Sequence, residues 1–271
     1  MPSSTLTPNM AFAQIVQLSD SHLFAEPSGA LMGLNTLQSL TDICSQVLKE
    51  QTQIDAVLGT GDIAQEASFA AYEHFIEQAQ RLGAPIRWLP GNHDEAAMMR
   101  GVSFDRALMQ PVLEVGAWRV LLLDSSVEGQ VAGFVTPDQL QHLEASLKAH
   151  PNTPHLICLH HHPVPIGCAW MEPIGLKNAA ELLAITDHHP NAKALLWGHV
   201  HQEFNQMRGH TQLLATPSTC VQFKPNSVNF EVSGQAPGYR WLRLYADGSL
   251  HTGVSRLKNF SFVPSKDAKG Y

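Results

Sequence analysis

Residues 86–94 read IRWLPGNHD, a short apolar run followed at once by Gly91-Asn92-His93-Asp94. The run has the length and composition of a buried strand. Amide, imidazole and carboxylate groups are the side chains that bind borderline metal ions and move protons. In open α/β sheets, ligands bind at the carboxyl ends of the strands. This stretch therefore predicts an α/β fold with a functional site at a strand end.

Short apolar runs alternate with helical patterns on both sides of this stretch. The predicted strands are Gln14–Leu18, Ala56–Leu58, Ile86–Leu89, Val120–Leu123, Leu156–Leu159 and Ala194–Trp197. The predicted helices are Thr36–Lys49, Ser68–Arg81, Pro137–Ala149 and Asn178–Ile185. Thr136 is a suitable cap for the third helix, and Pro137 suits its first position. Such alternation is typical of βαβ units in which helices cover buried sheets.

The pattern becomes β-rich after about residue 202. Strands are predicted at Leu213–Ala215, Val228–Val232, Tyr239–Tyr245 and Leu250–Val254, and Asp247-Gly248 predicts a hairpin between the last two. No repeat or linker composition interrupts the chain. We therefore predict one domain over 1–271, with a metal-site core at 12–202, a β-rich part at 203–262 and a tail at 263–271. The residues from Ser261 on are polar and are predicted to be loosely ordered.

Composition excludes several classes of protein. The 271 residues carry 17 Lys and Arg against 24 Asp and Glu, a net charge of −7, and 44% are hydrophobic. That hydrophobic fraction excludes a disordered chain. No apolar stretch reaches the ~20 residues of a membrane span. The acidic balance disfavours a nucleic-acid binder, which would normally carry a basic patch.

The cysteines and the N-terminus indicate a cytoplasmic protein. Cys44, Cys158, Cys168 and Cys220 show no Cys-x-x-Cys spacing, so they predict neither a zinc knuckle nor a redox motif. The segment Met1–Ala13 lacks Lys, Arg and a continuous apolar core, unlike a secretory signal. We expect reduced thiols that pack as small hydrophobic residues. The sequence makes no prediction of the oligomeric state.

Polar residues follow five predicted strands. The five groups are Asp20-Ser21-His22, Gly61-Asp62, Gly91-Asn92-His93-Asp94, His160-His161-His162-Pro163 and Gly198-His199-Val200-His201. Each group alone has an ordinary explanation as a turn or a solvated loop. All five in order, each at a strand end, predict one shared metal site. Carboxylate, amide and imidazole ligands suit Mn²⁺, Fe²⁺ or Zn²⁺.

Local geometry gives a reason for two of the spacings. Residues i and i+2 of an extended chain face the same way, so Asp20 and His22 are expected to reach one metal, as are His199 and His201. Glycines precede three of the polar groups. They are expected to allow tight turns and close approach of the backbone.

This ordered set resembles the calcineurin-like metallophosphoesterase family, whose pattern is D-x-H, G-D, G-N-H-D/E, H and G-H-x-H. The stretches Leu159–Trp170, Lys177–Leu182 and Leu213–Lys224 resemble the bacterial class III 3′,5′-cyclic-AMP phosphodiesterases. The likeness runs from about residue 12 to 262. It implies a four-layer α/β/β/α sandwich with two metals at the strand ends.

The resemblance also implies a ligand set. Asp20, His22 and His201 would hold the first metal, and Asn92, His199 and one His of the triple run the second, with Asp62 bridging both. The family's ligand histidine usually lies two residues before a proline, which selects His161. His160 would then finish the strand, and His162 would face the substrate or pack. The residues expected to contact substrate are His22, Asp62, Asn92, His93, His162 and His201.

The implied reaction is hydrolysis of 3′,5′-cyclic AMP to 5′-AMP by attack of a metal-bridged hydroxide on phosphorus. His93 is the family's candidate for protonating the leaving oxygen or stabilising the phosphoryl oxygens. Many relatives orient this histidine with an Asp three residues after the bridging Asp. Here that position is Gln65, which can hydrogen-bond but carries no charge. The way in which His93 is oriented is therefore an open question for the structure.

The residues that recognise the base and the class of substrate are each open to more than one interpretation. Pro217-Ser218-Thr219-Cys220 with Phe223 and Lys224 can contact the nucleotide, with Phe223 stacking on the base, or can form a structural turn with a packed aromatic ring. The same machinery can act on another phosphodiester, such as a glycerophosphodiester, or on a phosphomonoester. A metal-binding module without turnover is a third interpretation, disfavoured because it would not need His93.

Overall fold

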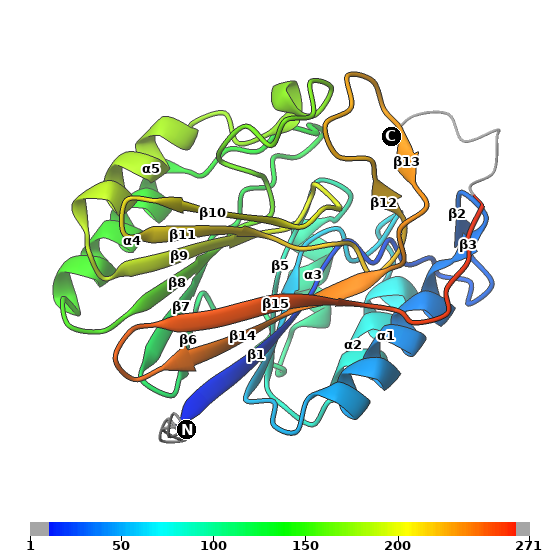
Figure 1. Ribbon diagram of the computed structural model, residues 1–271, viewed down its shortest axis with the longest axis horizontal. Coiled ribbons are helices and arrows are strands. Elements are labelled where there is room, and N and C mark those ends of the chain that lie inside the picture. The colour runs from blue at the N-terminus through cyan, green and yellow to red at the C-terminus, as the bar shows by residue number, and fades with distance from the viewer. Residues whose placement is uncertain (1–10, 264–271) are drawn as a thin grey trace, which may run out of the picture.

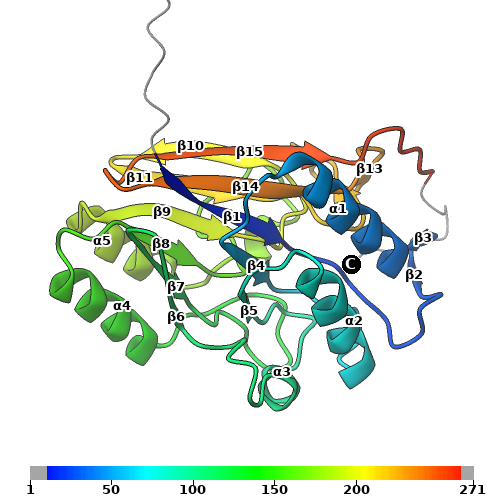
Figure 2. The same cartoon turned by 90° about the horizontal axis from the view of Figure 1, so that it is seen from below.

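The computed structural model describes residues 11–263. Two β-sheets lie face to face, with helices on both outer sides (Figures 1 and 2). The first sheet has the strand order β15-β14-β1-β4-β5, and the second has the order β10-β11-β9-β8-β7-β6. This is the four-layer α/β/β/α sandwich that the family resemblance implies.

The elements follow one another along the chain in the order of their labels. The helices are α1 (Thr36–Glu50), α2 (Phe69–Gln80), α3 (Ala96–Val102), α4 (Pro137–Ala149) and α5 (Ala179–His188), with a short 3₁₀ helix η1 (Glu172–Ile174). The strands of the first sheet are β1 (Phe12–Leu18), β4 (Ala56–Thr60), β5 (Ile86–Leu89), β14 (Gly238–Tyr245) and β15 (Leu250–Arg256). The strands of the second are β6 (Val112–Val115), β7 (Trp118–Leu122), β8 (His155–Cys158), β9 (Ala192–Trp197), β10 (Phe204–Arg208) and β11 (Thr211–Ala215). Two further strand pairs are β2 (Ala30–Leu31) with β3 (Leu34–Asn35), and β12 (Gln222–Phe223) with β13 (Val232–Ser233).

Three apolar clusters hold the layers together. One packs α1, α2 and α3 against the first sheet, and a second packs α4 and α5 against the other sheet. The third fills the space between the sheets, where Ile15, Leu58, Leu156 and Leu196 are fully buried. Each sheet is therefore buried on both faces, which explains why its strands are continuous apolar runs.

The parallel strands set the position of the polar groups. β4 pairs in parallel with β1 and with β5, and β8 pairs in parallel with β7 and with β9. Their carboxyl ends therefore meet at one edge of the sandwich. Most predicted elements are confirmed within a few residues, and Pro137–Ala149 and Ile86–Leu89 are confirmed at both ends.

Several local predictions can be compared directly. Thr136 caps α4 by accepting from the N–H of Gln139, and the Asp247-Gly248 hairpin joins β14 to β15. The strand predicted at Val228–Val232 is wrong over most of its length, because only Val232–Ser233 pairs with β12. The last eight residues of the predicted tail lie outside the described residues. Within the described part of the chain, no helix is both long and apolar enough to cross a membrane.

Candidate metal centre

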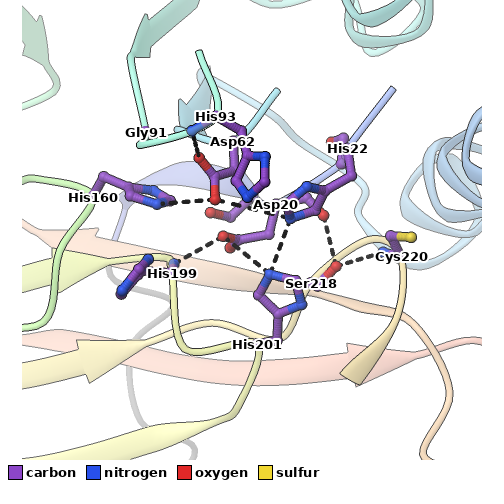
Figure 3. Close-up of polar contacts among 12 residues, drawn as sticks. Asp20, His22, Asp62, Gly91, His93, His160, His199, His201, Ser218 and Cys220 are labelled. Carbon is purple, nitrogen blue, oxygen red and sulfur yellow. Dashed lines mark hydrogen bonds and ion pairs between the residues drawn. The ribbon is translucent and has the colours of Figure 1, made fainter. Parts of the chain in front are cut away.

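The loops that follow β1 and β4 are joined to each other by backbone hydrogen bonds. The Asp20 N–H donates to the Gly61 carbonyl at 3.0 Å, and the His22 N–H donates to the Asp62 carbonyl at 3.0 Å. The Ser218 hydroxyl donates to the Asp20 carbonyl at 2.7 Å. Segments far apart in sequence thus hold the Asp20 loop from two sides. Figure 3 shows the side chains that these loops bring together.

Five of the predicted ligands have a left-handed backbone. They are Asp20 (φ 55°), His22 (φ 46°), Asp62 (φ 48°), His199 (φ 65°) and His201 (φ 48°). Such a conformation costs on the order of 1–3 kcal/mol for a residue other than glycine and is concentrated at functional sites. The expectation that an extended chain turns His199 and His201 the same way is therefore wrong, as is the same expectation for Asp20 and His22. Both lie beyond the end of β1, and the left-handed turns aim their side chains.

Glycines allow the ligand loops to approach one another, as the sequence predicts. A Cβ on Gly91 would lie 2.1 Å from Asp62 Oδ1, and one on Gly61 would lie 2.4 Å from His160 Nδ1. Gly198 is enclosed in the same way, with a Cβ there placed 2.8 Å from Asp20 Oδ2. Any side chain at these positions would displace a predicted ligand or its loop.

Asp20, His22 and His201 form a first cluster whose candidate ligand atoms lie within 4.8 Å of one another. His22 Nδ1 lies 2.8 Å from Gln65 Oε1, and His201 Nδ1 lies 2.8 Å from the Val221 carbonyl. Since oxygen accepts in both contacts, each Nδ1 carries the proton. The two Nε2 atoms then face each other at 3.1 Å, with Asp20 Oδ1 at 3.5 Å from His201 Nε2. Lone pairs and a carboxylate that converge in this way suit a divalent cation.

His160 lies at the centre of a second cluster. Its Nδ1 donates to the Thr60 carbonyl at 2.8 Å, which turns its Nε2 inward. That Nε2 lies 3.3 Å from Asp62 Oδ2 and 3.3 Å from Asn92 Oδ1. The structure therefore brings His160 to the expected bridging carboxylate and to Asn92.

His199 completes the second cluster and gives a direct test of whether a cation fits. Its Nε2 donates to the Ile174 carbonyl at 3.1 Å, so Nδ1 carries a lone pair. That Nδ1 and Asp20 Oδ2 are buried and have no hydrogen-bond partner among the described residues. Buried polar atoms without a partner are costly unless something binds them. The chain thus holds His and Asp groups that can bind divalent metal ions.

His161 has a different environment from the one that the proline spacing predicts. Its Nε2 donates to the Val131 carbonyl at 3.0 Å, and its Nδ1 lies 2.8 Å from the Ser125 hydroxyl. Both ring nitrogens therefore have protein partners, although the ring packs beside His160 and His199. His160, placed by the sequence argument at the strand end, is the residue that faces Asp62.

Burial and charge set the protonation of the cluster. Burial lowers the pKa of His199 well below its usual value, and neighbouring His161 and His160 lower it further. Burial also lowers the pKa of His22 despite the attraction of Asp62. For His160, burial lowers the pKa but the Asp62 charge outweighs it, so the pKa rises to about 9. The imidazole that binds a metal ion is the neutral one, so a cation held by His160 would displace this proton.

His93 lies beside the first cluster and is held by the Asp62 carboxylate and by one backbone carbonyl. Its N–H donates to Asp62 Oδ1 at 2.9 Å, and its ring Nδ1 donates to the Gln65 carbonyl at 3.1 Å. The Gln65 side chain accepts a hydrogen bond from His22 instead. The Gln65 backbone carbonyl thus orients His93, as an acidic side chain does in many relatives. Because a backbone carbonyl exists at every residue, the sequence could not reveal this contact.

The two remaining substrate contacts considered from sequence lie deeper in the protein. His162 is buried and stacks on His199 with ring centroids 5.6 Å apart. Phe223 is fully buried and stacks on His201 at 4.0 Å. Ser218 and Thr219 hydrogen-bond to the loop at residues 19–21, and exposed Lys224 pairs with Glu231. Of the two interpretations of this segment, the structure favours the packed turn over base stacking.

Comparison with known proteins finds relatives that match almost the whole chain. The model of the calcineurin-like phosphoesterase family matches residues 13–203. A Pseudomonas aeruginosa protein named 3′,5′-cyclic adenosine monophosphate phosphodiesterase CpdA is 47% identical over 257 residues, covering 95% of this chain and 94% of its own. The protein of the same name from Escherichia coli K12 is 43% identical over 264 residues, covering 96% of each chain.

Solved structures with little sequence identity share the fold. A dimetal phosphatase from Danio rerio superposes with a TM-score of 0.59 at 15% identity, covering 89% of this chain and 98% of its own. The purple acid phosphatase PPD1 from yellow lupin gives a TM-score of 0.62 at 14% identity, covering 97% of this chain and 53% of its own. The sandwich, the ordered ligand loops and the family match lead to one conclusion: this chain belongs to the calcineurin-like metallophosphoesterase family.

Proposed function

We propose that this protein is a dinuclear-metal phosphodiesterase that hydrolyses 3′,5′-cyclic AMP to 5′-AMP. The observation that carries the proposal is the 47% identity, over 95% of the chain, to a protein named as a cyclic AMP phosphodiesterase. The two clusters of buried donors beside His93 support it, because they provide both metal ligands and a group for proton transfer.

The proposed ligand set differs from the sequence expectation at one position. Asp20, His22 and His201 hold the first cation, and Asn92, His160 and His199 hold the second, with Asp62 between them. His160 replaces His161 because its Nε2 faces both Asp62 and Asn92 at 3.3 Å, whereas both His161 nitrogens already have partners. Fe²⁺, Mn²⁺ and Zn²⁺ all suit such imidazole, amide and carboxylate ligands.

Two bound cations would neutralise phosphate charge and acidify a water molecule. The protein's own residues then act on the other side of the reaction. Hydrolysis of the cyclic ester breaks the bond between phosphorus and the ribose 3′ oxygen. As an alkoxide this oxygen is a poor leaving group, so the reaction needs a residue that protonates it. His93 is the proposed donor of this proton, and the Gln65 carbonyl, which accepts from its Nδ1 at 3.1 Å, orients the ring.

Burial of the ligand cluster fits this chemistry. Asp20, Asp62, His160 and His199 have no exposed surface, so the side chains proposed to hold the cations are shielded from bulk water. Backbone donors to Asp62 and Asp20, from His93 and His199, fix both carboxylates before a substrate arrives. A cytoplasmic location is part of the proposal, and the four buried, unpaired cysteines agree with a reducing compartment.

The experiment that tests the proposal compares three substrates with one purified preparation: cyclic AMP, a glycerophosphodiester and bis(4-nitrophenyl) phosphate. We expect cyclic AMP to have the highest kcat/KM and 5′-AMP to be the product by chromatography. Asp62→Ala serves as the inactive control for contaminating enzymes. Preference for the glycerophosphodiester, or formation of 3′-AMP, would contradict the proposed activity.

A further inference from the structure

The segment at residues 218–223 lies against the first cluster although it supplies none of the proposed ligands. It follows β11, and all the proposed ligands come earlier in the chain. Its Ser218 hydroxyl donates to the Asp20 carbonyl at 2.7 Å, a contact drawn in Figure 3. Its Val221 carbonyl accepts from His201 Nδ1 at 2.8 Å. The segment therefore contacts two of the residues proposed to hold the first cation.

Phe223, at the end of this segment, stacks face to face on the His201 ring. The two ring centroids are 4.0 Å apart, the ring planes differ by 6°, and both side chains are fully buried. In the second cluster, His162 stacks on His199 with centroids 5.6 Å apart and planes that differ by 18°. The ring contact on the first cluster is thus the closer and the more nearly parallel of the two.

The two contacts of His201 restrain its ring in different directions. A ring N–H points in the plane of the ring, so the hydrogen bond to Val221 turns Nε2 towards Asp20 and His22. That bond alone still lets the ring twist about the N–H direction, whereas a flat ring packed on its face does not. Loss of a partner that orients a metal-binding histidine typically weakens metal affinity by about 10–100-fold.

The Phe223 ring is itself held by its neighbours. Trp170 and Phe230 pack edge-on against it, with ring centroids 5.2 and 5.4 Å away. The backbone before it is also fixed, because Gln222 Nε2 donates to the Ser218 carbonyl at 2.8 Å. A ring that is fixed in this way can orient His201 without losing conformational freedom when a cation binds.

The contact between Phe223 and His201 should also be stronger when a cation is bound. A divalent cation on Nε2 withdraws electron density from the imidazole and makes its ring more positive. The face of a phenyl ring carries partial negative charge and attracts such a ring. An interaction that is stronger in the metal-bound form than in the empty form contributes to metal affinity as well as to folding.

We infer that Phe223 is a positioning residue for the first cation, because its ring fixes the plane of the His201 imidazole. The inference rests on the proposed function, since it takes Asp20, His22 and His201 as the ligands of one ion. It adds that different parts of the chain control the affinities of the two ions, and that the segment at residues 218–223 acts on the first alone.

The test replaces the ring with an apolar side chain that has no flat face. Phe223→Leu is the first variant, and Phe223→Met is the second, because a flexible thioether fills irregular space in a core. Phe75→Leu is the matched control, since Phe75 is also fully buried but lies on α2, in the apolar cluster against the first sheet. Calorimetry measures Mn²⁺ binding to metal-free preparations, and thermal unfolding of the same preparations measures their stability.

We expect both Phe223 variants to raise the Kd of one Mn²⁺ ion by roughly tenfold or more and to leave the Kd of the other unchanged. Phe75→Leu should lower thermal stability but keep the wild-type affinity for both ions. Equal weakening of both ions by the Phe223 variants, no weakening of either, or the same weakening in Phe75→Leu would overturn the inference.

A second background identifies which ion is affected. His201→Ala removes the imidazole on which Phe223 stacks, so adding Phe223→Leu should leave the affinity for the remaining ion unchanged. A further loss of affinity in the double variant would contradict the inference, because Phe223 would then act on the second site or on the whole fold. None of these titrations uses a nucleotide. If the wild type does not hydrolyse cyclic AMP, the proposed activity fails, whereas the titrations still decide the role of Phe223.

Discussion

Gly91→Ala should damage the metal centre although it adds only one methyl group. The new Cβ would lie 2.1 Å from Asp62 Oδ1 and 2.4 Å from the Asp62 backbone nitrogen, where ordinary contact begins at 3.4 Å. Relief therefore requires a shift of about 1.3 Å, and rotation of the Asp62 side chain alone cannot provide it. Displacement of this size can reduce kcat on the order of 100-fold. Overpacking of a tight site costs about 1–3 kcal/mol of folding stability.

The assay measures bound metal by elemental analysis, cyclic AMP turnover and thermal unfolding on the same preparations. Gly101→Ala, within helix α3, is the control, because its Cβ would meet no side chain closer than Phe69 Cε1 at 3.8 Å. That change should stabilise the protein by about 0.5–1 kcal/mol and leave metal content intact. A Gly91→Ala protein that binds two metals per chain and turns over substrate like the wild type would refute the close-approach argument.

Four further substitutions separate the roles of individual residues. His160→Ala should lower metal content, whereas His161→Ala should keep it. Loss of metal only in His161→Ala would restore the proline-based assignment. His93→Ala should keep both ions yet lose roughly 2–4 kcal/mol of transition-state stabilisation for cyclic AMP. The loss should be smaller on an aryl phosphodiester, whose leaving group needs no proton. Equal losses on both substrates would contradict the acid role and leave His93 as an electrostatic stabiliser. Asp62→Ala should lose both metals, and tight binding of two ions by that protein would disprove the bridge.

Most of the fold could be predicted from sequence because its elements have strong local patterns. The apolar run at Ile86–Leu89 and the Thr136-Pro137 helix start are confirmed at the residue level. The strand Phe204–Arg208 was missed because it is largely exposed and polar, with its only partner on one side. The helix Ala96–Val102 was missed because it is short and lacks a side-chain cap.

The candidate site could be predicted in its residue types but not in its ring orientations. The choice between His160 and His161 depends on which oxygen each Nδ1 meets, and those oxygens belong to Thr60 and Ser125 in distant parts of the sequence. The left-handed turns at the ligands likewise follow from tertiary contacts, such as the Ser218 hydroxyl on the Asp20 carbonyl. The spacing between a histidine and the next proline carries no information about such contacts.

The central claim is that the His, Asp and Asn side chains of the two clusters make this chain a metal-dependent cyclic AMP phosphodiesterase. Removing and restoring the metal tests it most directly. The purified protein is stripped with a chelator, shown by elemental analysis to be metal-free, and titrated separately with Fe²⁺, Mn²⁺ and Zn²⁺. The account predicts no conversion of cyclic AMP by the stripped protein. It also predicts recovery of 5′-AMP formation that reaches its plateau at two bound ions per chain. Full activity of the metal-free protein, or a plateau at one ion, would contradict it.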